Sequence, residues 1–137
     1  MKSSLLKLLT LLLVIVVVAA AGSRVKETSS STSGPYCLNT GSSADYEAHK
    51  AHVLDELANV TPTMEGYSYS TSFPPAGSAA AQDVVYGSAS CTPDVGVTEC
   101  VSCLIEAKLS LAQSCAYDFY GLVILPLCRM SFSPVAE

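Results

Sequence analysis

The chain has 137 residues, of which 50% are hydrophobic and 14% are charged, with six cysteines, no tryptophan and a formal net charge of −5. This length favours a single folded domain. The acidic balance excludes the basic surface that nucleic-acid-binding proteins use, and the sequence holds no polybasic stretch that would attract an anionic membrane. We therefore expect neither nucleic acid nor a membrane surface as a partner.

Residues 1–23 have the composition of a secretory signal peptide. Lys2 and Lys7 precede an apolar run that ends at Ala21, and small residues follow it. The run is too short to span a bilayer comfortably, and a membrane anchor is the alternative. No later segment reaches transmembrane length, because Pro126 interrupts the longest apolar run. The sequence therefore predicts a soluble protein that is secreted to the cell exterior.

Residues 24–35 form a segment rich in Ser and Thr. Little in it is apolar enough to offset its chain entropy, so we expect a disordered tether. The folded domain is predicted to cover residues 36–134, with a short first strand at 36–38.

The segment 44–59 predicts an amphipathic helix that Pro62 stops. Its apolar side holds Tyr46, Val53, Leu54, Leu57 and Val60. A separate polar stripe holds Asp45, His49, His52 and Glu56. We interpret this stripe as a solvated face. A metal site is the alternative, because side chains three and four residues apart converge on a helix, but no ligand from another element is evident and we expect no metal.

Two strands are predicted next, at 66–73 and 83–90, with a Pro/Gly turn at 74–77 between them. Residues 98–117 predict a second helix, whose apolar positions are Val101, Leu104, Ile105, Leu111, Ala112 and Cys115. Residues 119–132 predict one or two further strands. This order indicates an α+β fold with both helices on one face of an antiparallel sheet. We interpret the tyrosines, Tyr67 and Tyr69 among them, as half-buried sheet residues, and a stacking platform for sugar or peptide is the alternative.

All six cysteines lie after the leader, at Cys37, Cys91, Cys100, Cys103, Cys115 and Cys128. An even count in a short exported chain predicts three disulfides, although the sequence alone leaves their pairing open. Cys100 and Cys103 also have the spacing of a redox pair or of half a zinc site. The βαβ context and the second ligand pair that those sites need are absent from the sequence, so we expect structural disulfides and no cofactor.

The cysteines in the middle of the chain follow the pattern C-x8-C-x2-C, from Cys91 to Cys103, with Tyr86-Gly87 before it and Leu104 after it. This pattern resembles the plant cysteine-rich stress-antifungal, or ginkbilobin-like, domain family, and the resemblance covers about residues 36–132. It implies two helices against a five-stranded antiparallel sheet. It also implies three disulfides, Cys37–Cys115, Cys91–Cys100 and Cys103–Cys128.

Ginkbilobin-like proteins bind mannose and inhibit fungi, and three polar residues form the family's sugar site. The matching positions here hold Leu38, Leu122 and Ser133, so no carbohydrate-binding residue is carried over. A leucine offers no hydrogen bond to a sugar hydroxyl that has lost its water.

The resemblance implies a secreted defence or stress protein of the plant apoplast with a mannose-type carbohydrate as its partner. The first alternative is an extracellular protein-interaction module without lectin activity, because leucine suits a protein contact. The second is a truncated ectodomain of a receptor-like kinase.

Asn59-Val60-Thr61 is an N-glycosylation sequon, although Pro62, directly after it, disfavours its use. The sequence contains no nucleophile elbow, metalloprotease helix motif or phosphate loop. Its two histidines lie on one predicted helix, with no free cysteine as a nucleophile. The sequence therefore predicts that the protein is not an enzyme.

Overall fold

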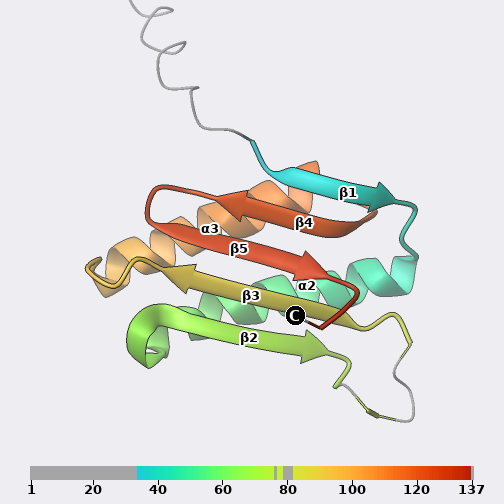
Figure 1. The fold of residues 1–137 in the computed structure, drawn as a ribbon, viewed down its shortest axis with the longest axis horizontal. Helices are drawn as coiled ribbons and strands as arrows, with labels where there is room; N and C mark the ends of the chain where they lie inside the picture. Colours follow the sequence, from blue (N-terminus) through green and yellow to red (C-terminus); the bar gives the residue numbers. More distant parts are fainter. Residues whose placement is uncertain (1–33, 76, 79–81, 137) are drawn as a thin grey trace, which may run out of the picture. The chain divides into compact units, whose positions relative to one another are not determined.

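The computed structural model describes residues 34–75, 77–78 and 82–136 (Figure 1). The predicted signal peptide at 1–23 and most of the predicted tether at 24–35 lie outside the described residues. The elements follow in the order β1 (Tyr36–Thr40), α2 (Ala44–Val60), η1 (Thr61–Thr63), η2 (Glu65–Tyr67), β2 (Ser68–Phe73), β3 (Val85–Cys91), α3 (Val97–Ser114), β4 (Asp118–Ile124) and β5 (Cys128–Ser133). Neither α2 nor α3 is apolar enough over its length to cross a membrane.

The five strands form one antiparallel sheet in the order β1-β4-β5-β3-β2. Both helices lie against the same face of this sheet, α2 over β2 and β3 and α3 mainly over β4 and β5 (Figure 1). We call the opposite face, which no described helix covers, the open face. The predicted fold class, an α+β domain with two helices on one face of a sheet of about five strands, is confirmed.

The core lies between the sheet and the two helices, because alternate strand residues point toward the helices. In β3, Val85, Gly87, Ala89 and Cys91 are buried, while the residues between them are half-exposed. The largest fully buried side chains of the core are those of Tyr46, Leu57, Leu104, Leu111 and Met130. The strand residues between the core positions therefore form the open face.

Helix α2 confirms the prediction for 44–59 to within one residue at its end. Ser43 caps it, because its hydroxyl accepts a hydrogen bond from the Tyr46 amide at 3.1 Å. The helix also buries Lys50, which the sequence pattern did not predict. The Lys50 ammonium donates to the Glu47 carboxylate and to the Cys115 carbonyl at 3.0 Å, and it lies 4.5 Å from the centre of the Phe132 ring.

The ion pair between buried Lys50 and half-buried Glu47 changes the titration of Glu47. Burial alone would raise the pKa of its carboxyl group. The hydrogen bonds from Lys50 and Ser42, together with the Lys50 charge, outweigh burial and lower that pKa below its usual value of 4.5. Glu47 is therefore charged in the folded protein over a wider acidic range than a free carboxylate.

One strand and one helix are shorter at one end than the sequence predicts. The strand predicted at 66–73 begins only at Ser68, because Gly66 (φ 77°) and Tyr67 (φ 50°) adopt left-handed conformations within a short turn. Tyr67 therefore lies outside the strand that carries Tyr69. The helix predicted at 98–117 ends at Ser114, and Tyr117 (φ 63°) turns the chain into β4.

The predicted buried stripe of α3 is wrong at two positions. Ile105 and Ala112 are exposed, and Cys100, Cys103 and Ala107 occupy the core instead. The reason is that Cys100 and Cys103 are both bonded to strands, which turns their side of the helix toward the sheet.

Three disulfides connect α3 to the sheet. Cys100 bonds to Cys91 of β3, Cys103 to Cys128 of β5, and Cys115, at the end of α3, to Cys37 of β1. These pairs are the ones that the resemblance implies. Their separations of 78 residues for Cys37–Cys115 and nine for Cys91–Cys100 differ widely, so they restrict the unfolded chain to different extents.

Candidate functional site

One half of the open face is apolar. Tyr36 of β1 lies opposite Leu122 of β4. Because the two strands are antiparallel, Leu38 and Ile124, each two residues further along its own strand, lie on opposite sides of this pair. Tyr36 is 63% exposed, Ile124 61% and Leu38 44%, while Leu122 is half-buried. We call these four residues the apolar strip. Exposed apolar side chains that adjoin one another are typical of a binding surface.

The other half of the open face is hydroxylated and hollowed. A groove of about 310 Å³ lies over β2, β3 and β5, and Ala136 closes one side of it. Its open-face side chains are those of Ser70, Ser72, Tyr86, Ser88, Ser131 and Ser133. We call it the hydroxyl groove. None of the described residues that line it carries a charge, so it suits a neutral ligand that forms hydrogen bonds.

Two contacts shape the hydroxyl groove. The Ser88 and Ser131 hydroxyls form a hydrogen bond of 3.0 Å across the β3–β5 pair. Ser133 donates to the Val135 carbonyl at 2.6 Å, which holds the C-terminal residues at the edge of the groove. The Ser133 proton is therefore already used within the protein, and the hydroxyl oxygen remains as an acceptor.

The three positions that match the family's sugar contacts fall on both halves of this face. Leu38 and Leu122 belong to the apolar strip, and Ser133 lies at the edge of the hydroxyl groove. Asn39, next to Leu38, has a left-handed backbone (φ 58°) in the edge strand. Sequence reasoning missed the groove, although its signal was present as alternate serines in three separate strands, which only the sheet order brings together.

The polar stripe of α2 packs against β2 and the chain that follows it. One Glu56 oxygen accepts from the Tyr69 hydroxyl at 2.6 Å and from the Thr71 hydroxyl at 3.1 Å. The His52 ring stacks on Phe73 with its centre 4.0 Å away. Our interpretation of the stripe as a solvated face is therefore wrong for Glu56, which is half-buried, whereas His52 keeps 52% of its side chain exposed. The hydrogen bond to Glu56 also raises the pKa of Tyr69.

The other two residues of this stripe, His49 and Asp45, differ in their surroundings. His49 Nδ1 lies 2.9 Å from the Asp83 carbonyl oxygen, whereas Asp45 is exposed. The stripe thus attaches the edge strand β2, which carries part of the hydroxyl groove on its other face, to α2.

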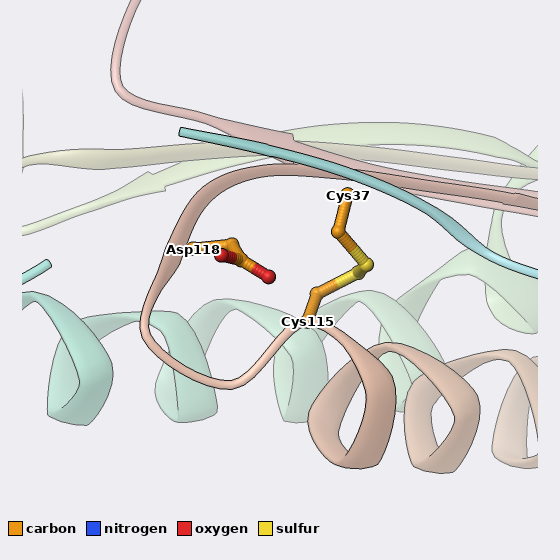
Figure 2. A group of neighbouring side chains, drawn as sticks. All are labelled: Cys37, Cys115 and Asp118. Atoms are coloured by element: carbon orange, nitrogen blue, oxygen red, sulfur yellow. A yellow bond between two sulfur atoms is a disulfide. The ribbon is translucent and has the colours of Figure 1, made fainter. Parts of the chain in front are cut away.

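Among the described residues, one group of potential metal ligands gathers closely, namely Cys37, Cys115 and Asp118 (Figure 2). Both sulfur atoms belong to a disulfide, as Figure 2 shows, so neither is a thiolate that could bind a metal. The single carboxylate that remains does not make a metal site.

The comparisons with known proteins agree with this architecture. Residues 31–134 match the profile of the family described as Salt stress response/antifungal. The chain belongs to this family. The match covers the whole described sheet and both helices, and it confirms the resemblance that the cysteine pattern indicates.

One relative of known name is similar to part of this chain. Cysteine-rich repeat secretory protein 59 of Arabidopsis thaliana is 24% identical over 95 residues, which are 69% of this chain and 31% of the relative. Its name describes a secretory protein, in accord with the predicted export. This chain spans less than a third of that relative's length.

Two solved structures share the fold. Both are tandem DUF26 ectodomains of Arabidopsis thaliana cysteine-rich receptor-like proteins, PDLP5 and PDLP8. PDLP5 gives a TM-score of 0.66 at 19% identity, covering 77% of this chain and 51% of that one. PDLP8 gives 0.65 at 14% identity, covering 76% and 50%. This chain therefore matches about half of each extracellular structure.

Proposed function

We propose that this chain is a non-catalytic recognition protein of plant defence or stress responses, which acts in the apoplast and binds another extracellular protein through the apolar strip. The proposal includes removal of residues 1–23 as a signal peptide. The family description, the secretory relative and the extracellular solved neighbours support this setting.

The observation that carries the proposal is the chemistry of the apolar strip. Leu38 and Leu122 stand where the resemblance places two of the family's sugar contacts, and Tyr36 and Ile124 extend the same surface. Fully burying one such side chain is worth about 1.5–3 kcal/mol, and tyrosine is enriched at the centres of protein interfaces. A sugar hydroxyl would find no partner among the leucines, whereas a protein surface gains from covering them.

The test is capture of a partner from plant extracellular fluid. The secreted, disulfide-bonded chain is immobilised and compared with Leu38→Arg and with Leu109→Arg. The two leucines are 44% and 49% exposed, but Leu109 lies on α3, on the other side of the sheet. We expect the native chain and Leu109→Arg to capture the same protein, and Leu38→Arg to bind it at least tenfold more weakly. Equal capture by all three would refute the proposal.

A second candidate function rests on the hydroxyl groove. Its uncharged lining and its tyrosine suit a neutral carbohydrate, which needs hydrogen-bond partners and an apolar ring surface. The test is an array of neutral glycans that includes mannose polymers, probed with the native chain, Ser88→Val and Leu38→Arg. This function predicts binding that Ser88→Val abolishes and Leu38→Arg retains. No binding by the folded native chain would eliminate it.

A further inference from the structure

The sequon at Asn59 lies where a glycan would leave the open face uncovered. Asn59 belongs to the last turn of α2 and is exposed. Helix α2 covers the opposite face of the sheet (Figure 1). Asn59 lines neither the apolar strip nor the hydroxyl groove. The fold therefore has room for a large polar substituent at this position.

The third residue of the sequon, Thr61, is the unusual one. Its side chain is fully buried, and no described residue offers its hydroxyl a hydrogen-bond partner. The backbone of Thr61 is satisfied, since its amide donates to the Leu57 carbonyl and its own carbonyl accepts from the Met64 amide at 3.2 Å. A buried hydroxyl without a partner is unfavourable, and valine would fill the same space without it. The folded structure thus gives no reason for a threonine here.

N-glycosylation does give a reason, because the acceptor motif requires a serine or threonine two residues after the asparagine. We propose that Asn59 carries an N-linked glycan, attached before α2 and η1 close around Thr61. This inference rests on the proposed secretory function, because the modification occurs along the secretory route.

The chemistry of the step is a transfer from a lipid diphosphate-linked oligosaccharide, the co-substrate of the secretory glycosyl transferase. A bond forms between Asn59 Nδ2 and the anomeric carbon of the oligosaccharide. The bond from that carbon to the diphosphate oxygen breaks, and the lipid diphosphate leaves with the electron pair. The amide proton passes to a base of the transferase.

The order of events follows from the chain. Five of the six cysteines come after Asn59 in the sequence, so no native disulfide can form while the sequon is first exported. Helix α2 buries an apolar face in the core, and most of the stability of such a helix comes from tertiary packing that the unfolded chain lacks. Pro62 by itself disfavours use of the sequon, but it also disfavours a helical conformation at Thr61 in the unfolded chain. Folding nevertheless places Thr61 in that conformation, with φ −50° and ψ −43°. The sequon is therefore accessible before folding and closed afterwards.

The test expresses the full chain, with its leader, in plant cells and examines the Asn59 peptide by mass spectrometry. The native chain is compared with Asn59→Gln, Thr61→Ser and Thr61→Val. We expect a glycan on the native chain and on Thr61→Ser, and none on the other two. Enzymatic removal of the glycan should leave aspartate at position 59.

A second measurement uses the unglycosylated, disulfide-bonded protein from a bacterial periplasm. There Thr61→Val should unfold at the same temperature as the native chain or at a higher one. A clearly lower unfolding temperature would give Thr61 a structural role and overturn the inference. A secreted, disulfide-bonded native chain with unmodified Asn59 would also overturn it while leaving the proposed function intact. A chain that keeps its leader inside the cell, with Asn59 unmodified, would overturn both.

Discussion

The two halves of the open face are built on the same sheet, yet they offer different surfaces. On the β1–β4 side, alternate residues are apolar and form the strip, with Leu38 and Ile124 at its ends. On the β2–β3–β5 side, alternate residues are mainly serines, and they line a groove of about 310 Å³. The two halves differ in side chains that point away from the core, so core packing does not determine which residues stand there. One scaffold can thus carry an apolar surface and a hydroxylated groove side by side.

The two halves also differ in how they are held. The apolar half includes the edge strand β1, which a disulfide ties to the end of α3. The hydroxylated half includes the edge strand β2, which the side chains of α2 hold through Glu56 and His52. Because the attachments are separate, a substitution can disturb one half without the other.

The largest expected effect is on the disulfide that anchors β1. Replacing both Cys37 and Cys115 by alanine should lower the free energy of unfolding by about 4 kcal/mol, because their bond closes a long loop. The same change at Cys91 and Cys100, whose loop is short, should cost less than about 3 kcal/mol. Denaturant unfolding measures both. Equal losses of unfolding free energy in the two variants would show that loop length does not determine how much each disulfide stabilises the fold.

The ion pair between buried Lys50 and half-buried Glu47 should give the next largest effect. Glu47→Gln leaves the Lys50 ammonium buried without its counter-charge, which should cost about 3 kcal/mol in chemical denaturation. The effect should depend on pH. The pKa of Glu47 is lower in the folded protein than in the unfolded chain, so its contribution is complete above about pH 4.5 and is lost as the pH falls through the folded pKa. Identical pH profiles for the variant and the native chain would contradict this account.

Two glycines let buried side chains pack closely against the sheet, one beneath each half of the open face. A Cβ at Gly121, below the apolar half, would collide with the Phe132 ring, and one at Gly87 would lie 2.5 Å from a Val53 methyl group. Each change to alanine should cost about 1–3 kcal/mol, with the larger loss at Gly121, because a ring yields less than a methyl group. Thermal unfolding measures this, with Gly34→Ala as the control, since a Cβ there meets no atom within 4 Å. A loss at Gly34 as large as at Gly121 would be inconsistent with it.

The smallest effect on folding is expected for a substitution in the apolar strip, which should nevertheless have a large effect on binding. Ile124 is 61% exposed and lies opposite Arg129 of β5, so Ile124→Glu should change the free energy of unfolding by less than about 0.5 kcal/mol. It should nevertheless weaken binding of the captured partner at least tenfold, because it places a charge in an apolar contact. Unfolding and binding titrations on the same preparation test the two statements together. A stable variant with native affinity would exclude Ile124 from the interface.

The fold could be predicted from the sequence because its signals are local. Pro62 and the helical period fixed the bounds of α2, and the cysteine spacing indicated the family. The ends of α3 and β2 could not be predicted, because left-handed residues such as Tyr67 and Tyr117 depend on the packing around them. Burial of Lys50 was missed for the same reason, since its partners include the Cys115 carbonyl, far along the chain.

The candidate site was predicted only in part. The resemblance indicated Leu38, Leu122 and Ser133 as the positions to examine, but it did not show that they divide between two surfaces. The hydroxyl groove arises from three strands that are distant in sequence, and its serines become neighbours only through the sheet order. A pattern that depends on strand order cannot be recognised within one segment of the sequence.

Site-specific photo-crosslinking in plant extracellular fluid tests the central claim most directly. A photo-reactive amino acid is placed at Leu38 in the apolar strip, at Ser72 in the hydroxyl groove or at Leu109 on α3, in three otherwise native chains. The account predicts a protein adduct from position 38 and none from positions 72 and 109. An adduct from position 72 or 109, with none from position 38, would contradict it.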